Sequence, residues 1–556
     1  MKRFSIILFM LLLCSLVIIG CGTTQTTAPK TSAIPATSVA PPAPTTPSAP
    51  TTQAKPAATT APATTAAPAP ADAAKYGGNL IILTTSVVAQ GAPWEGGVLW
   101  ARVGRAVYEP LVTCDENENI YPWLAESWDI APDGKSLTFH LRKGIKFHDG
   151  TDFNAEAVKF SLEGWKPGTS GGLMLEFVTS VEVMDQYTVK LNLKQWDSLL
   201  LLQFATNDVV MCSPTAAKKP TTPEKQAYDH MVGTGPFTLV EFKKDISAKF
   251  KKFDGYWQKG KPYLDTVEFK GIADTTVRNM AFEKGDGNFV EPLLPNDRNN
   301  LEKKGFITGE GTMGFIMVLI PDGSNAKSPF ADQRVREAVE YAMDKEGLYQ
   351  GLFKGRWPPA YQQALRNDPY FASGVKERKY DPAKAKQLLA EAGYPTGFKM
   401  VFHGDTRGDN DQMVSFQTFM KEVGIDSTLD IADPGRYNTM ANQGWEGLLK
   451  PGFPNPSSSV SLLSRFGTRP YFPSMYSSPG WFEKWDAMRA QRDNKVRIDM
   501  VRQLIKQMVD ECKIIPMYET HPQWATISGK GQVVDLDWCG KKNTNYWNPT
   551  EAWLKK

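Results

Sequence analysis

Alternation of apolar and polar residues predicts several half-buried strands. Residues 137–141 alternate in this way, and the turn residues 143–144 would let the strand continue on the return through residues 145–147. A second hairpin is predicted from the alternation in residues 181–183 and 189–193. Short alternating runs of this kind are typical of sheets with one face against a core.

Other segments repeat their apolar residues at helical spacing, so the chain is mixed α/β. Asn154 is a suitable N-cap for one helix, and residues 335–343 predict another. Residues 381–393 begin with Asp-Pro and end in Gly, the usual asymmetry of helix ends. A buried stripe over 501–512 predicts a further helix, and the apolar run 514–518 predicts a strand.

The longest apolar run lies at the start of the chain, where residues 4–19 follow Lys2 and Arg3. This pattern predicts a secretory signal peptide over residues 1–20. The run ends in Ile-Ile-Gly-Cys, which resembles the bacterial lipobox, so we expect Cys21 to be lipidated. A multi-span membrane protein is excluded, because no other apolar run of that length occurs.

Residues 21–75 form a tether of unusual composition. Thr, Ala and Pro supply 42 of the 54 residues after Cys21, and none is aromatic. Such a segment cannot bury enough apolar surface to offset its ordering entropy, so we expect it to be disordered. The folded part would then work outside the cytoplasm, anchored by lipid to the outer face of the cytoplasmic membrane.

Length and charge narrow the function further. A chain of 556 residues suggests two or three domains. Its 63 Lys and Arg against 60 Asp and Glu give a net charge of +3, of which two charges belong to the leader. A balance so close to zero gives no electrostatic reason to expect nucleic-acid binding.

Motifs for a bound cofactor or metal are weak. Residues 309–314 spell a dinucleotide fingerprint, but an apolar run follows them where a helix is needed. Residues 115–126 have the acidic spacing of a calcium loop without its glycine or flanking helices, which favours a hairpin turn. The histidines show no ligand spacing, so we expect no protein-bound metal and no cofactor; they are His140, His148, His230, His403 and His521.

Four cysteines remain beyond the lipidation site, and an even number outside the cytoplasm permits two disulfides. Three pairings are possible, and Cys512 can equally be a thiol on its apolar stripe. The others are Cys114, Cys212 and Cys539.

Ten short blocks along the chain carry a family resemblance. They are 122–128 (PWLAESW), 133–135 (DGK), 139–150 (FHLRKGIKFHDG), 233–237 (GTGPF), 256–257 (YW), 260–265 (GKPYLD), 334–338 (RVREA), 380–382 (YDP), 393–395 (GYP) and 424–425 (GI). In this order they resemble the family 5 bacterial extracellular solute-binding proteins, the oligopeptide-, dipeptide- and nickel-binding receptors of ABC importers.

The resemblance implies a two-lobe α/β fold of the periplasmic-binding-protein type, in its large peptide-binding subclass. Lobe I would comprise residues 76–320 with an inserted subdomain, and residues 516–556 would return to it. Lobe II would comprise residues 321–515. Hinge strands are expected near 314–321 and 514–523.

The resemblance also implies a function. A receptor of this family captures a small solute by lobe closure and delivers it to a membrane permease, so we expect a monomer with no catalytic residues. The expected solutes are, in order, a peptide or peptide-like compound, an opine, an oligosaccharide and a metal chelate. One alternative is a secreted hydrolase that acts on a glycan through two carboxylates, although no such pair stands out in the sequence. The other alternative is a ligand-presenting co-receptor for a membrane sensor.

Candidate ligand contacts follow from the segments that line the site in relatives. Residues 444–456 form one wall, with Trp445, Glu446, Phe453 and Asn455 as contacts. Relatives often carry there an Asp that pairs with a peptide's α-ammonium, and Gly452 stands near its place. Either Glu446 replaces that Asp, or the ligand has no such amine.

Arg407 falls near the position where dipeptide-binding relatives place an arginine on the ligand carboxylate, a task that suits the planar guanidinium. It could instead pair with Asp405 or Asp409 on the surface. The remaining candidates are pocket aromatics, for which core packing is the alternative role: Trp94, Trp100, Tyr437 and Tyr518.

Overall fold

The computed structural model describes residues 74–87, 91–95, 101–115, 118–165, 175–205, 209–312, 314–406, 410–451, 465–467, 472–536 and 550–556. The predicted signal peptide, nearly all of the tether and several predicted residues lie outside them: Cys21, Trp100, Arg407, Phe453, Asn455 and Cys539. Among the described residues, no helix has the length and apolar character needed to cross a membrane.

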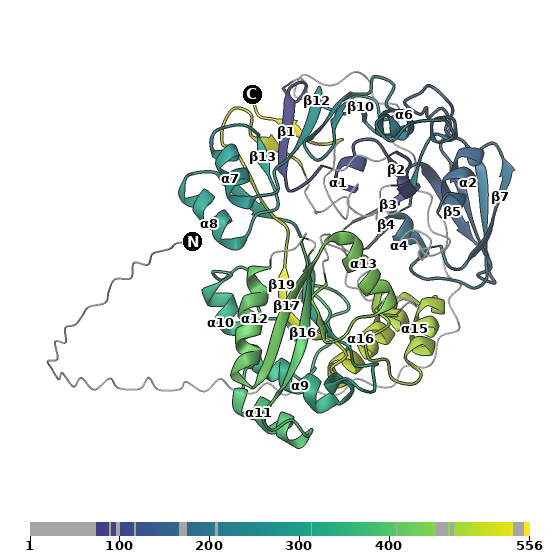
Figure 1. Cartoon of the computed structure of the whole chain (residues 1–556). Helices are drawn as coiled ribbons and strands as arrows, with labels where there is room; N and C mark the ends of the chain where they lie inside the picture. The colour runs from purple at the N-terminus through teal and green to yellow at the C-terminus, as the bar shows by residue number, and fades with distance from the viewer. Residues whose placement is uncertain are drawn as a thin grey trace, which may run out of the picture. The chain divides into compact units, whose positions relative to one another are not determined.

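The first sheet has the strand order β10-β11-β12-β1-β13-β20-β14 within the described part of the chain (Figure 1). β1 is parallel to β12 and β13, whereas β20 is antiparallel to its neighbours β13 and β14. The bounds are β1 (Asn79–Thr84), β10 (Phe237–Lys243), β11 (Ser247–Lys252), β12 (Thr266–Gly271), β13 (Phe289–Val290), β14 (Ile307–Glu310) and β20 (Gln523–Thr526), with helices α7 (Thr275–Glu283) and α8 (Pro295–Lys303).

A four-stranded antiparallel sheet, β5-β6-β8-β7, is inserted between β1 and β10 in the chain. Its strands are β5 (Ala125–Ile130), β6 (Ser136–Leu141), β7 (Val178–Asp185) and β8 (Thr188–Leu193). The alternation of β6 and the β7–β8 hairpin confirm the two strand predictions. The predicted return strand at 145–147 is wrong, because this segment makes only an isolated bridge between Lys146 and Asp152.

Short elements connect these two sheets. Asn154 caps α2 (Ala155–Glu163) as predicted, by accepting a hydrogen bond from the Ala157 amide. β3 and β4 pair as a hairpin around residues 115–119. This confirms the hairpin turn predicted for the segment whose acidic spacing resembles a calcium loop. The others are η1 (Pro93–Glu95), α1 (Ala101–Gly104), β2 (Glu109–Pro110), β3 (Val112–Cys114), β4 (Ile120–Pro122), α4 (Leu200–Ala205), β9 (Val210–Met211), α5 (Pro214–Ala217), α6 (Gln226–His230), β21 (Val533–Val534) and β22 (Trp553–Leu554).

The second large sheet has the order β17-β16-β18-β15-β19. β16 is parallel to β17 and β18, and β15 is antiparallel to β18 and β19. β15 is almost wholly buried because its successive side chains enter two different apolar cores. The bounds are β15 (Phe315–Pro321), β16 (Phe398–Asp405), β17 (Ile425–Ala432), β18 (Leu448–Leu449) and β19 (Ile515–Thr520).

Helices cover both faces of this sheet, with α12 on one face and α13 on the other (Figure 1). The predicted helices appear as α9, α11 and α16, and Asp381 caps α11 as expected. Cys512 lies beyond the end of α16, in a left-handed conformation with a φ of 48°, and is a buried thiol. The bounds are η3 (Pro329–Ala331), α9 (Gln333–Ala342), α10 (Lys345–Gly351), α11 (Pro382–Glu391), α12 (Asp411–Glu422), α13 (Pro434–Gln443), α15 (Trp481–Ala490) and α16 (Asn494–Asp510).

The chain passes between the two large sheets twice among the described residues. β14 belongs to the first sheet and β15 to the second, so residues 311–314 make one passage. β19 belongs to the second sheet and β20 to the first, so residues 521–522 make the other. The expected lobe boundaries at 320 and 516 fall inside β15 and β19.

Candidate functional site

The two passages are hydrogen-bonded to each other. The Gly311 amide donates to the Pro522 carbonyl at 2.9 Å. His521 Nδ1 lies 3.1 Å from the Gly311 carbonyl oxygen, and its Nε2 lies 3.0 Å from Glu519 Oε1. The His521 ring thus hydrogen-bonds to the first passage through one nitrogen and to β19 through the other.

Close packing at the first passage requires a glycine. A Cβ on Gly314 would fall far inside the van der Waals radius of the Thr520 carbonyl oxygen and 2.8 Å from His521 Nδ1. The two connections therefore approach each other more closely than side chains would allow. The two large sheets are therefore connected covalently by two short chain segments that lie next to each other.

Polar groups gather where the parallel strands of the first sheet end. Thr84 ends β1, and its Oγ1 donates to Glu291 Oε1 at 2.7 Å, although each residue is only 1% exposed. Arg278 of α7 donates to the carbonyls of Ile272 and Pro292 at 2.8 and 3.0 Å. These bonds fix the segments that follow β12 and β13 at the edge where open α/β sheets bind ligands.

The second sheet has an equivalent edge. Its parallel strand β16 ends at the buried Asp405, and β17 ends at Ala432, where Asp433 caps α13. The chain continues from these strand ends toward Arg407, and from β18 toward Phe453 and Asn455, which lie outside the described residues. Their placement in the sequence, directly after strands of this edge, keeps them as predicted contacts.

Two glutamines have buried side-chain amides with unmet hydrogen-bonding capacity. Gln363 and Gln523 are each 1% exposed, and among the described residues neither the Oε1 nor the Nε2 atom of either side chain has a hydrogen-bond partner. Gln523 is the first residue of β20 after the second passage. Gln363 is three residues before Arg366, whose amide donates to Glu519 Oε2 at 3.4 Å beside that passage. Unpaired buried amides are costly and require an explanation.

The structure places the predicted aromatics in packed cores. Tyr518 is 2% exposed, stacks on Trp357 at a centroid distance of 5.6 Å and donates its hydroxyl to Gln412 Oε1. Trp94 is half-buried and meets Phe160 edge-on at 5.6 Å. Tyr437 of α13 is also buried, in a different apolar cluster from Tyr518.

Trp445 and Glu446 line a hollow of about 550 Å³. Trp445 is buried and fixed through its backbone, which exchanges two 2.8 Å hydrogen bonds with the Ser474 hydroxyl, whereas Glu446 is exposed. The full lining is Asn325, Val401, His403, Met440, Gly444, Trp445, Glu446 and Ser474.

The strand register separates this hollow from the passages. Leu448 is paired with Pro321 and Leu449 with Ile320, so β18 runs toward the passage end of β15. Trp445 and Glu446 precede β18 and therefore lie at its far end. The hollow thus lies at the end of β18 away from the passages.

A charged network stabilises the wall of this hollow. His403 Nδ1 lies 2.9 Å from Asp430 Oδ2, and its Nε2 lies 2.9 Å from the Glu446 carbonyl oxygen. Arg436 donates to both oxygens of Asp430, and this hydrogen bonding lowers the pKa of that carboxyl. The polar groups support the loop that carries Trp445, and no cluster of three His, Cys, Asp or Glu suited to a metal occurs in the described part of the chain.

Sequence reasoning missed the two glutamines. Gln363 follows two prolines in a short mixed stretch, and Gln523 begins an ordinary short strand, so neither stands out by type or spacing. The one available signal was proximity in the chain, because Gln523 directly follows the predicted second hinge.

Comparison with known proteins gives the family. Residues 119–470 match the model of the bacterial extracellular solute-binding proteins, family 5. The chain is 33% identical over 341 residues to the glutathione-binding protein GsiB of Shigella flexneri, an alignment that covers 60% of this chain and 65% of that protein. The matched region thus spans just under two thirds of the length of these relatives.

Solved structures show the same fold. The periplasmic binding protein DppA of Helicobacter pylori, in complex with the peptide STSA, matches with a TM-score of 0.77 and 22% identity, over 87% of this chain and all of that chain. The binding protein AgaA from A. tumefacien R10, in complex with agropinic acid, matches with a TM-score of 0.71 and 25% identity, over 83% and 94%. These matches confirm the predicted fold class, a two-lobe α/β protein of the periplasmic-binding-protein type.

Proposed function

Because the chain belongs to the family 5 bacterial extracellular solute-binding proteins, we propose that it captures a small solute between two lobes and delivers it unchanged to an ABC permease. The observation that carries this proposal is the pair of hydrogen-bonded passages, residues 311–314 and 521–522, between two separate α/β sheets. A rotation about two adjoining connections opens or closes the space between the lobes without breaking either sheet.

The lobes follow the sheets. Lobe I comprises residues 76–310 and 523–556, and lobe II comprises residues 315–520, so the hinges are the two passages themselves. The solute favours the closed form only if it contacts both lobes, because only a difference in affinity between the open and closed forms shifts their equilibrium.

We assign the solute to the carboxyl ends of the parallel strands and to the two glutamines near the second passage. Gln523 of lobe I and Gln363 of lobe II have buried amides whose donors and acceptors a peptide-like solute would satisfy. Arg407 supplies a partner for a carboxylate, and Phe453 and Asn455 complete the wall. Trp445 and Glu446 line the separate hollow, so Glu446 is not proposed as the partner of a solute ammonium.

A peptide-like solute agrees with what related proteins bind. The relative named above is a glutathione-binding protein, and the two solved structures hold the peptide STSA and agropinic acid. Lipidation of Cys21 and the tether that follows would keep the receptor at the outer face of the cytoplasmic membrane, within reach of its permease. As a monomeric receptor the protein performs no reaction on the solute.

The test is calorimetric titration of the purified protein with reduced glutathione, the peptide STSA and agropinic acid, with mass spectrometry of the recovered probe. We expect at least one probe to bind and to be recovered intact. Substituting Arg407→Ala should weaken that binding at least tenfold. No binding to any of the three, or a chemically altered probe, would overturn the proposal.

The glutamines give a sharper test. Gln363→Leu and Gln523→Leu each remove an unpaired buried amide, so the free energy of unfolding of the ligand-free protein should rise by about 1 kcal/mol. The same variants should bind the probe less tightly. Gln387→Leu on the exposed face of α11 is the control and should change neither quantity. Lower stability together with weaker binding would make the glutamines structural.

A further inference from the structure

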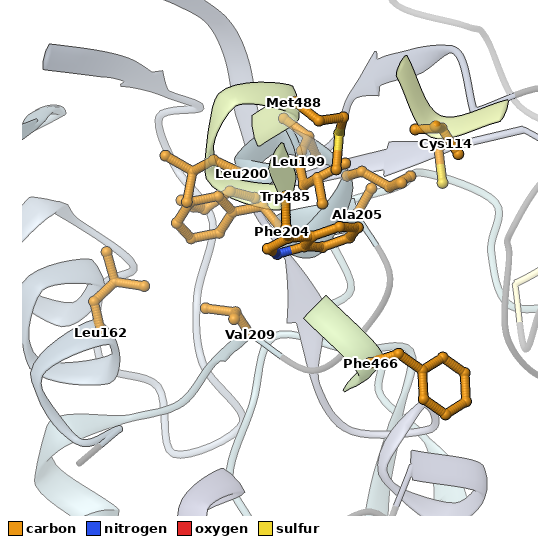
Figure 2. Close-up of a cluster of buried hydrophobic side chains, with 14 of the residues drawn as sticks. Cys114, Leu162, Leu199, Leu200, Phe204, Ala205, Val209, Phe466, Trp485 and Met488 are labelled. Carbon is orange, nitrogen blue, oxygen red and sulfur yellow. The ribbon is translucent and has the colours of Figure 1, made fainter. Parts of the chain in front are cut away.

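Apolar side chains of helix α15 in lobe II pack against helix α4 of lobe I and the residue before it. Trp485 and Met488 lie among Leu199, Leu200 and Phe204 (Figure 2). Trp485 is 1% exposed, and Met488 and Phe204 are 0% exposed. Water is therefore excluded from this contact, although its two sides belong to different lobes.

An ion pair closes the edge of the same contact. Arg489 Nη2 lies 2.7 Å from Asp197 Oδ2 and its Nε lies 3.3 Å from Oδ1, so the carboxylate is held by two donors. The side chains of Arg489 and Asp197 are only 3% and 1% exposed. Arg489 also donates to Glu176 at 2.8 Å and lies over the Phe177 ring at 4.0 Å. All three guanidinium nitrogens thus hydrogen-bond to lobe I.

Backbone groups complete the contact. The Ser198 amide donates to the Arg489 carbonyl at 2.7 Å. Arg492 donates to the carbonyls of Pro132 and Ala131 at 2.5 and 2.8 Å. These are direct hydrogen bonds between the lobes, far in sequence from both passages.

The contact needs no solute. All of its partners are atoms of the protein, and none of them belongs to the carboxyl strand ends or to the two glutamines assigned to the solute. A buried, doubly hydrogen-bonded carboxylate–guanidinium pair is stable only while both partners stay together, because separation exposes the apolar face and leaves two charges to be rehydrated.

We propose that this contact, formed by Asp197, Ser198 and α4 on one side and by Trp485, Met488 and Arg489 on the other, is a latch that holds the lobes closed in the absence of solute. The inference rests on the proposed function, since it concerns the opening of the same two lobes. The latch sets the resting state of the receptor, and solute enters during brief openings.

The latch has kinetic consequences. Closure that precedes binding slows solute entry, because only the open fraction is competent. It slows solute loss even more, because the latch stabilises the closed complex as well. Weakening it should therefore raise the association rate of a bound probe, raise the dissociation rate further, and lower the overall affinity.

The experiment uses the ligand-free protein, so its outcome does not depend on finding the solute. Hydrogen–deuterium exchange with mass spectrometry follows peptides that cover residues 196–205 and 481–492, and small-angle X-ray scattering measures the radius of gyration. We expect strong protection and a compact form in the wild type. In Arg489→Met and in Asp197→Asn, exchange at residues 196–205 should rise by about tenfold or more, with a larger radius of gyration. Arg334→Met, which breaks an exposed ion pair with Asp332 inside lobe II, should match the wild type.

Three results would overturn the latch. The wild type could be expanded and unprotected at residues 196–205 without solute. The two variants could keep wild-type protection and size. Both variants could lose their circular dichroism and cooperative melting, which would make the contact part of a core that never opens. A compact, protected receptor that binds none of the three probes would leave the latch standing and reject the proposed function.

Discussion

Two of the junctions between the lobes, the passages and the latch, use opposite physical means. At the passages, the backbone segments come close at Gly314, and Gly311 hydrogen-bonds to Pro522 and His521. At the latch, Trp485 and Phe204 exclude water around a buried ion pair. Short backbone connections can change their dihedral angles while their hydrogen bonds persist. A contact that excludes water, in contrast, is lost as a whole when its two sides separate. The passages therefore set the axis of motion, and the latch sets which state is populated.

The largest expected effect is on the dry junction. Trp485→Ala should lower the free energy of unfolding in urea by about 3–5 kcal/mol, because it leaves a cavity against α4 and Gly467. Phe371→Ala is the control, since its ring is 38% exposed, and we expect it to cost less than about 1 kcal/mol. Equal losses in the two variants would mean that the contact is poorly packed.

A contact between the inserted subdomain and the rest of lobe I, at His148, should depend on pH, whereas the latch should not. Measuring unfolding at several pH values therefore distinguishes the two contacts. His148 Nε2 donates to the Gly235 carbonyl at 2.8 Å, and its buried Nδ1 has no partner. Burial, opposed by the Gly235 hydrogen bond, lowers the pKa of His148 to about 4. The unfolded value is about 6.5. The neutral ring therefore stabilises the fold fully above pH ~6.5, and this stability is lost as the pH falls through ~4.

The expected loss is about 3 kcal/mol of the free energy of unfolding between pH 7 and pH 4. His148→Phe should remove this part of the pH dependence, which urea unfolding at several pH values would measure. His140→Phe is the matched control, because His140 pairs with the exposed Asp129 and should keep the wild-type profile. Protection of the latch residues should persist through the same range. A His148→Phe profile identical to the wild type would contradict the assignment.

The smallest expected effect is at the passages. Gly314→Ala should cost about 1–3 kcal/mol, because its Cβ would clash with the Thr520 carbonyl and force the two connections apart. Thermal unfolding measures the loss, and exchange at the Gly311 amide should rise with it. Gly351→Ala at the end of α10 meets no atom within 4 Å and should be neutral. If Gly314→Ala were neutral too, the passages would be looser than the structure indicates.

The lobes and their elements were accessible from sequence where the signal is local. Asn154 and Asp381 are of residue types that favour the N-cap position, so they predict where two helices begin. The alternation in β6 predicts a strand with one buried face. The return strand at 145–147 failed because its apolar residues fill the core without pairing along a ladder. The local pattern of apolar residues predicts which side chains are buried. A strand also needs a neighbouring strand to pair with, which this pattern does not show.

The site was predicted less well because its geometry depends on register. Trp445 lies at the end of β18 away from the passages, which follows only from the pairing of Leu448 with Pro321 and of Leu449 with Ile320. Asp197 and Arg489 are 292 residues apart, so no spacing rule connects them. The unpaired amides of Gln363 and Gln523 become evident only when every neighbouring donor and acceptor is known.

The position of β20 bears on the order in which the molecule can assemble. This strand lies between β13 and β14, yet residues 523–526 come about 210 residues after β14 in the chain. A nascent chain that has emerged as far as β19 can complete the five-stranded sheet, while the seven-stranded sheet still has an open slot. The lobe that begins first therefore finishes last, and a truncation before residue 523 should leave it unable to mature while its partner folds.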